Sequence, residues 1–141
     1  MGYKFLEDVA IADVCIEATG KTTEEMFEQA GLATTSVMVE LKTLGKKLKK
    51  DFTIEAESLD KLLYEFLEEI VYLKDTEGFL FSKYKIKLSK DKLYKLKIKC
   101  NGEKINPKKQ TLLADVKAVT LHMFEVKKVK GKLYCRFVLD I

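Results

Sequence analysis

The stretch Ala12-Asp13-Val14-Cys15-Ile16 opens a predicted strand close to the N-terminus of the chain. Successive side chains of a strand point to opposite faces, so Asp13 lies away from the apolar series, which is Ala12, Val14, Ile16 and Ala18. The penultimate residue, Asp140, stands in the same relation to a final strand whose apolar face is Leu133, Cys135, Phe137 and Leu139. If the two strands are neighbours, both carboxylates converge beside the terminal carboxylate of Ile141. Such an arrangement either repels itself or holds a cation.

The length and composition of the chain fit one domain that covers residues 1–141. Hydrophobic residues make up 47% of the sequence, which is enough for a sizeable core, and the 34% of charged residues are nearly balanced in sign. No apolar run approaches the roughly 20 residues that a membrane span requires. The N-terminal segment is short and charged and does not match a signal peptide. We therefore expect a soluble cytoplasmic protein.

Three cysteines, Cys15, Cys100 and Cys135, lie far apart in the sequence, and each falls in an expected strand. An odd number of cysteines at such spacing predicts neither a disulfide framework nor a zinc site. We interpret them as small strand residues in a reducing compartment.

The net charge of +4 conceals two segments of opposite sign. Residues 79–110 contain eleven lysines and two acids, a local balance of +9. Residues 54–78 contain eight acids and two lysines, a balance of −6. A surface divided in this way can steer a charged partner, although the solvated faces of ordinary strands and helices produce the same pattern.

Two amphipathic helices are predicted. The first begins at the capping box Thr22-Thr23-Glu24-Glu25 and continues with helical spacing of its apolar residues until it ends near Gly45. The lysine-rich run 46–50 is expected to be a connector. The second helix has Ser58 as its N-cap and ends before Gly78. Its apolar stripe is the clearest in the chain: Leu59, Leu62, Leu63, Phe66, Leu67, Ile70 and Val71.

Alternation of apolar and polar residues predicts about seven strands. Residues 79–88 and 94–100 form the clearest pair, a hairpin with one apolar and one cationic face, and a change of phase at Ser82-Lys83 indicates a bulge. Asn101-Gly102 and Asn106-Pro107 predict turns or loops. The expected fold class is α+β, a single domain in which two amphipathic helices pack on a mostly antiparallel sheet of about seven strands.

His122 is the only histidine, and the sequence around it does not match a catalytic motif. No serine lies in a nucleophile elbow, and the seven glycines are scattered rather than gathered in a phosphate-binding loop. A histidine that acts alone needs an orienting acid, for which Asp13, Asp115 and Asp140 are candidates. We favour a structural or interface role for His122 over a hydrolase or transferase site.

The lysines of the hairpin from Lys83 to Lys99 support an alternative function. Lysines contact phosphates, and aromatic rings stack on bases. By the alternation argument Tyr84 and Tyr94 lie on the apolar face, away from the lysines, so interleaved stacking is not expected. An RNA-binding module that uses this hairpin is the second hypothesis.

A series of short segments occurs in one order from end to end of the chain. They are Phe5-Leu6, Ala12-Asp13-Val14 with Ile16, Gly20-Lys21-Thr22 with Glu24-Glu25 and Phe27, Leu63-Tyr64 with Phe66-Leu67 and Glu69, Asp75-Thr76-Glu77-Gly78, Val116-Lys117-Ala118-Val119-Thr120 with His122, and Asp140-Ile141. In this combination the chain resembles the archease family. The family commonly has His-Thr before Ala-Asp, whereas this chain has no histidine from Asp8 to Asp13. Asp115-Val116-Lys117 stands where a Glu-Val-Lys pattern is common and keeps its charges.

The resemblance implies a function that composition alone does not. Archeases assist the GTP-dependent tRNA-splicing RNA ligase, which joins 2′,3′-cyclic phosphate or 3′-phosphate ends to 5′-hydroxyl ends. The ligase first takes guanylate onto an active-site histidine, and the archease speeds this guanylylation and supports multiple turnover. An archease is thus a chaperone-like protein cofactor and not an enzyme, and tRNA is reached only through the ligase.

The resemblance also implies a site for a divalent cation, most often calcium. Its ligands in this chain would be Asp13, Asp140 and the terminal Ile141. Lys117, His122 and Asp115 are the further candidate functional or interface residues, and no catalytic residue is expected.

Overall fold

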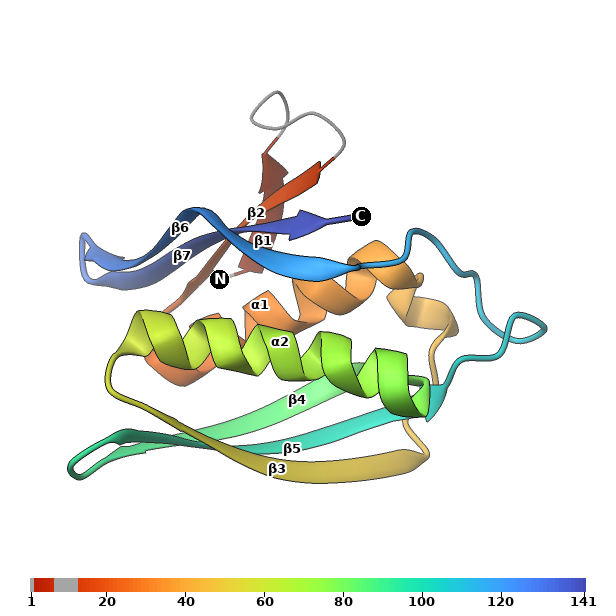
Figure 1. The fold of residues 1–141 in the computed structure, drawn as a ribbon, viewed down its shortest axis with the longest axis horizontal. Helices are drawn as coiled ribbons and strands as arrows, with labels where there is room; N and C mark the ends of the chain where they lie inside the picture. Colours follow the sequence, from red (N-terminus) through yellow and green to blue (C-terminus); the bar gives the residue numbers. More distant parts are fainter. Residues whose placement is uncertain (1, 7–12) are drawn as a thin grey trace.

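The computed structural model describes residues 2–6 and 13–141, and in these residues seven strands form two antiparallel sheets (Figure 1). The first sheet has the strand order β1-β2-β7-β6, and the second has the order β3-β5-β4. Along the chain the elements are β1 (Gly2–Leu6), β2 (Asp13–Gly20), α1 (Thr23–Met38), the short 3-10 turn η1 (Leu41–Thr43), β3 (Leu48–Ala56), α2 (Leu59–Glu77), β4 (Phe79–Lys90), β5 (Tyr94–Lys104), β6 (Ala118–Val129) and β7 (Lys132–Asp140).

The two helices form a layer between the two sheets (Figure 1). Helix α1 packs against both β2 and β4, and α2 packs against both β6 and β3. The sandwiched core contains the fully buried rings of Phe27, Phe66, Phe81 and Phe137. The α+β class and the two helices are therefore confirmed, but the strands are divided between two sheets. The division follows from α1, whose buried residues surround the helix axis, because a helix that is apolar on more than one side needs cover on both.

The antiparallel pairing of β2 with β7 joins the two ends of the chain. Its register runs from Asp13 opposite Asp140 to Gly20 opposite Leu133. Ile16 and Phe137 face each other on the buried side of this pair. The condition on which the acidic pair depends, that the first and last acidic strands are neighbours, is therefore met. Ala12 and the segment 8–12, where the histidine of the family would stand, lie outside the described residues.

Helix α1 is shorter than its apolar spacing predicts. The Oγ1 of Thr22 accepts a hydrogen bond from the amide of Glu25 at 3.1 Å, so the expected N-cap is confirmed. The helix ends at Met38, however, because Val39 is extended and pairs with Leu112 in an isolated bridge. The run 46–50 was expected to be a connector, but β3 already begins within it at Leu48.

The predicted bulge of the hairpin is confirmed, since the register of β4 against β5 shifts between Phe81 and Lys83. The prediction of a turn at Asn101-Gly102 is wrong, because both residues belong to β5. A Cβ atom on Gly102 would lie 1.9 Å from the carbonyl oxygen of Leu80. Glycine is thus required here for close approach of two strands at the bulge and not for a turn.

All three cysteines are free and lie in strands, as the sequence predicted, and the structure shows that all three are buried, Cys15 included although it shares a face with Asp13. Burial raises the pKa of the Cys100 and Cys135 thiols to about 12, so that neither is a reactive thiolate near neutral pH. Neither described helix combines the length and the apolar character needed to cross a bilayer.

We expect Gly102→Ala to lower the free energy of unfolding by about 1–3 kcal/mol, because the added methyl group overpacks the contact with Leu80. Chemical denaturation measures this change. Gly2→Ala is the matched control, since a Cβ atom there meets no atom within 4 Å. Equal stability of the two variants would contradict the close-approach explanation.

Candidate functional site

Asp13 and Asp140 occupy directly opposed positions at one end of the β2–β7 pair. Opposed residues of an antiparallel pair have Cβ atoms about 4.5–5.5 Å apart and their side chains on the same face of the sheet. Both residues are half-buried. Like charges at directly opposed positions are destabilising unless a cation lies between them.

The beginning of β6 completes this end of the sheet. The amide of Lys117 donates a hydrogen bond of 2.8 Å to the backbone oxygen of Asp140, and Ala118 lies opposite Asp140. Ile141 is half-buried and packs against the hydrophobic core. The structure therefore brings Asp13, Asp140, Ile141 and the backbone of Lys117 together, although they come from three parts of the chain.

The donors at this end fit a hard cation in kind but not in full number. Carboxylate oxygens are the ligands that Ca²⁺ and Mg²⁺ prefer, and neither a thiol nor an imidazole is paired with these acids. Within residues 2–6 and 13–141, no group of three or more His, Cys, Asp or Glu side chains is placed to hold a metal ion. Among the residues that the structure describes, the arrangement offers two carboxylate side chains, those of Asp13 and Asp140.

Asp115 does not belong to the acidic pair. Its carboxylate accepts a hydrogen bond of 2.6 Å from the ammonium of Lys74, which also donates to the backbone oxygen of Val116 at 2.7 Å and pairs with Asp75. Lys74 is buried, which disfavours its charged form, but the two carboxylates outweigh this effect and raise its pKa. The Asp115 contact therefore anchors the segment before β6 to the end of α2.

The sequence held one unused signal for this anchor. Lys74 continues the apolar stripe of α2, four residues after Ile70 and three after Val71. This spacing predicts that Lys74 is buried and therefore needs an acidic partner.

His122 lies in a wide bulge of β6 and is exposed. Its backbone amide donates to Oγ1 of Thr120 at 3.3 Å, and its imidazole has no hydrogen-bond or ion-pair partner in the described part of the chain. Within residues 2–6 and 13–141, no acid is hydrogen-bonded to its imidazole to orient it.

The outer faces of the two sheets treat charge differently. On the first sheet Lys4 pairs with Glu17 at 3.2 Å, Arg136 pairs with Glu125 at 3.0 Å, and the hydroxyl of Tyr134 donates to Glu17. Burial acts to raise the pKa of Glu17, but the hydrogen bonds from Tyr134 and Lys4 prevail and lower it. Away from the Asp13–Asp140 end, the charges of this face therefore neutralise one another.

On the second sheet the exposed side chains form what we call the lysine face: Lys83, Lys85, Lys87, Lys97 and Lys99. Lys85 lies opposite Lys99 and Lys87 opposite Lys97, so like charges face each other across the strands. None of the five forms an ion pair with an acid of the described ranges, although Asp51 lies across from Lys99. Tyr84 is buried and Tyr94 half-buried away from this face, as the alternation predicted.

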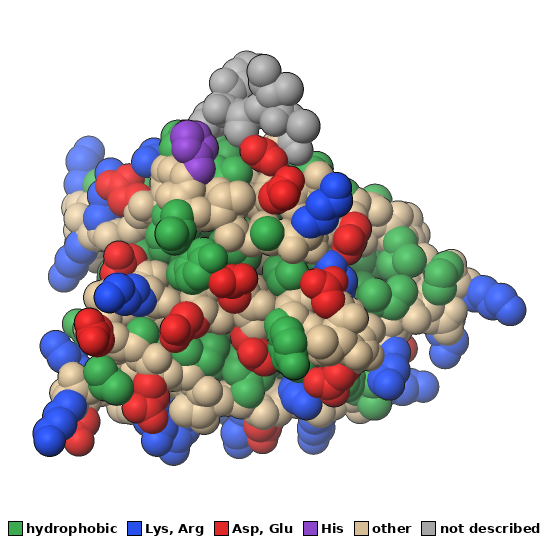
Figure 2. Space-filling model, viewed as in Figure 1, with side chains coloured by type: hydrophobic (Ala, Val, Ile, Leu, Met, Phe, Trp, Pro, Cys, Tyr) green, Lys and Arg blue, Asp and Glu red, His purple; other side chains and the backbone are tan. Residues whose placement is uncertain are grey.

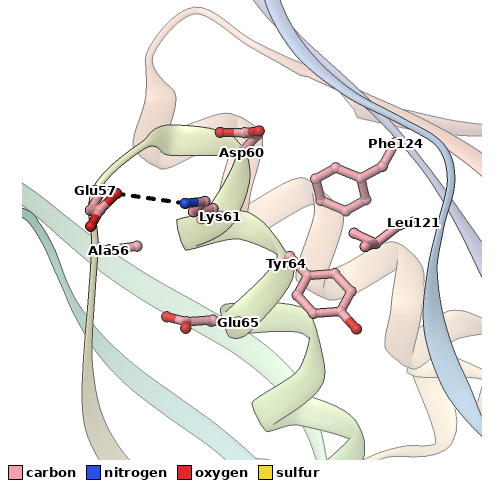
Figure 3. A pocket seen from close by; sticks show the side chains of 8 residues that line it. All are labelled: Ala56, Glu57, Asp60, Lys61, Tyr64, Glu65, Leu121 and Phe124. Atoms are coloured by element: carbon pink, nitrogen blue, oxygen red, sulfur yellow. Dashed lines mark ion pairs between the residues drawn. The ribbon is translucent and has the colours of Figure 1, made fainter.

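A groove between the N-terminal half of α2 and the β6 bulge is the feature that sequence reasoning missed (Figure 3). We call it the α2–β6 groove; it encloses about 380 Å³ and is lined by Ala56, Glu57, Asp60, Lys61, Tyr64, Glu65, Leu121 and Phe124. Acidic side chains gather on this side of the molecule, with hydrophobic side chains between them (Figure 2).

The fold and the acidic strand ends define a class: small α+β proteins with two helices between two antiparallel sheets and the chain ends paired in one of them. The model of the Archease protein family matches residues 3–141, and the chain belongs to this family. Protein archease of Pyrococcus furiosus is 40% identical over 132 residues, which cover 92% of this chain and 93% of that protein. Protein archease of Methanothermobacter thermautotrophicus is 35% identical over 141 residues, with 99% of each chain covered.

Solved structures agree with this assignment. The solution structure of Methanobacterium thermoautotrophicum protein 1598 superposes with a TM-score of 0.87 at 35% identity, over 99% of both chains. The crystal structure of an archease of Thermotoga maritima, described as a possible chaperone, gives a TM-score of 0.65 at 17% identity, over 94% of this chain and 93% of that one, and supports the fold alone.

We expect Asp115→Ala to lower the free energy of unfolding by about 1.5 kcal/mol, at the low end for a hydrogen bond to a charged group because Lys74 keeps two other partners. Thermal or urea unfolding measures the change. Asp51→Ala, an exposed acid outside any ion pair of the described residues, should stay within about 0.5 kcal/mol of the unchanged protein. Loss of function without loss of stability in Asp115→Ala would instead make Asp115 an interface residue.

Proposed function

We propose that this protein activates the GTP-dependent tRNA-splicing RNA ligase, which joins 3′-phosphate ends to 5′-hydroxyl ends. It acts in the cytoplasm as a protein cofactor that promotes guanylylation of the ligase and supports multiple turnover. It does not join RNA itself, and it reaches tRNA through the ligase. Membership of the archease family motivates the proposal, and the observation that carries it is the opposition of Asp13 and Asp140 across β2 and β7.

The proposal includes a divalent cation, calcium, held by Asp13, Asp140 and the terminal carboxylate of Ile141. When bound, the ion supplies positive charge that can attract and orient phosphate oxygens. The two aspartates present oxygen ligands on one face of the sheet at its end. The described residues alone supply fewer oxygen ligands than the roughly six to eight that calcium takes, so a donor from a partner can join them.

Two versions of this role differ in where the acidic end acts. In the first, the end enters the ligase site, and Asp13 and Asp140 help to place the triphosphate for in-line attack. In the second, the ion only orders the last residues of β7, and other surfaces shift the ligase toward its competent state.

Replacement of either carboxylate by an amide separates these versions. We expect Asp13→Asn and Asp140→Asn to lose stimulation of ligase guanylylation at least tenfold in a single-turnover assay. Without divalent metal both variants should be as stable as the unchanged protein or more stable, by about 0.2–1 kcal/mol, because a like-charge pair is removed. With calcium at 100 times its dissociation constant, only the unchanged protein should gain about 2.7 kcal/mol of stability.

Asp91→Asn, on the β4–β5 turn, is the matched control and should respond to calcium and stimulate guanylylation normally. Variants that lose the calcium response but keep full stimulation would leave only the second version. Full stimulation together with an unchanged calcium response would overturn the site itself. Extension of the chain by one glycine after Ile141 moves the terminal carboxylate and tests the third ligand.

The lysine face favours a second candidate function, direct contact with the RNA backbone. Opposed lysines without acidic partners destabilise the folded state by their repulsion, and bound phosphates would reduce this repulsion. The face is formed by side chains of two strands without an aromatic side chain among them. Binding would therefore depend on counterion release, with little preference for base sequence.

We expect an RNA duplex to bind with a slope of log K against log salt of roughly −4.5, since five lysines each contribute about 0.9 if all of them contact phosphates. Replacing Lys85 and Lys97 by glutamine should reduce the slope by about 2. The control removes the same charge from the loop after β5, Lys108→Gln with Lys109→Gln. An equal loss in the control would show that net charge alone, and not this face, governs binding.

A further inference from the structure

We infer that the α2–β6 groove is a docking site for a basic segment of a protein partner that carries one apolar anchor side chain. This inference rests on the proposed function, because the partner that supplies the segment is the RNA ligase. The groove is separate from the acidic pair: its lining residues come from the end of β3, from α2 and from the β6 bulge.

The apolar part of the groove suits a single anchoring side chain. Tyr64 and Phe124 meet edge to face, with ring centroids 5.9 Å apart and an interplanar angle of 76°. Leu121 projects beside them from β6 (Figure 3) and leaves 69% of its surface in water. Both rings are half-buried, so an apolar side chain of the partner would remove their remaining surface and that of Leu121 from water, as happens at the centre of protein interfaces.

The rim of the groove selects the charge of its occupant. Glu57, Asp60 and Glu65 line it, and the single cation, Lys61, already pairs with Glu57 at 3.6 Å. A carboxylate rim repels phosphate groups, so RNA does not fit here. Lysine or arginine residues of the partner complement the acidic rim, and its apolar anchor complements the apolar part of the groove.

The backbone of β6 is distorted in a way that exposes Leu121. Thr120 lies opposite Val138 and Glu125 opposite Arg136, so five steps along β6 are matched by two along β7. Met123 has a φ of 57°, which is uncommon for a residue other than glycine, and Nε of Arg136 donates to its carbonyl at 3.0 Å. A bulge of this kind redirects side chains. Here it interrupts the regular strand and holds Leu121 over α2.

Association with the ligase tests the inference. We expect Leu121→Glu to weaken binding of the purified ligase at least tenfold, which is about 1.4 kcal/mol, in a titration calorimeter. The paired change Glu57→Lys with Asp60→Lys should slow association and reverse its dependence on salt. Leu93→Glu, at an exposed leucine of the β4–β5 turn outside the groove, is the matched control and should bind normally. Because Leu121 is exposed, we expect the Leu121→Glu variant to fold, and a thermal melting curve checks this.

Each outcome bears on a different claim. Equal binding of the unchanged protein and Leu121→Glu would overturn the groove while leaving the proposed function intact. Failure of the unchanged protein to bind the ligase would overturn the proposed function and this inference together. A change from dimer to monomer in Leu121→Glu, with normal ligase binding, would assign the groove to a second copy of this chain and overturn the inference. Loss of duplex RNA binding alone would likewise overturn it in favour of RNA.

Discussion

Antiparallel pairing of β2 with β7 is the constraint on which the acidic site depends. The side-chain period of a strand is two, so a slip of one residue would turn Asp13 toward the core and Ile16 toward water. Burial of Ile16 and Phe137 therefore fixes the register, and the register fixes the acids opposite each other. The acids meet despite their repulsion, because the energy that holds them together comes from apolar residues on the other face.

The helix layer explains why the molecule has several surfaces available to partners. Since α1 and α2 are covered on two sides by sheets, the core is complete without the outer face of either sheet. Apart from its acidic end at Asp13 and Asp140, one outer face is neutralised by the Glu17 and Glu125 ion pairs, whereas the lysine face is left without counterions among the described residues. The helices already cover the inner face of these strands, so the opposed lysines on the outer face are not needed for folding. Their lack of counterions makes them candidates for a role in binding.

Sequence periodicity was sufficient wherever the partner of a residue was fixed by its own strand or helix. It predicted the faces of Asp13 and Asp140, the stripe of α2 and the bulge after Phe81. It failed where a distant segment decided the outcome. Helix α1 ends early because Val39 pairs with Leu112, and Gly102 serves a contact with Leu80 rather than a turn. The α2–β6 groove was not predicted from the sequence for the same reason, since its two walls are about 60 residues apart in the chain.

Strand β6 connects the acidic end with the groove. Ala118 lies opposite Asp140, and Leu121 follows three residues later, so the two features are separated by roughly 10 Å at ~3.3 Å per residue of strand. β6 is also an edge strand, with β7 as its only neighbour in the described sheet. A partner segment anchored at Leu121 would therefore lie along the edge that leads to Asp13 and Asp140. Because the acids face outward and the groove faces α2, one partner could reach both only by passing around this edge, which would fix its orientation relative to the acidic pair.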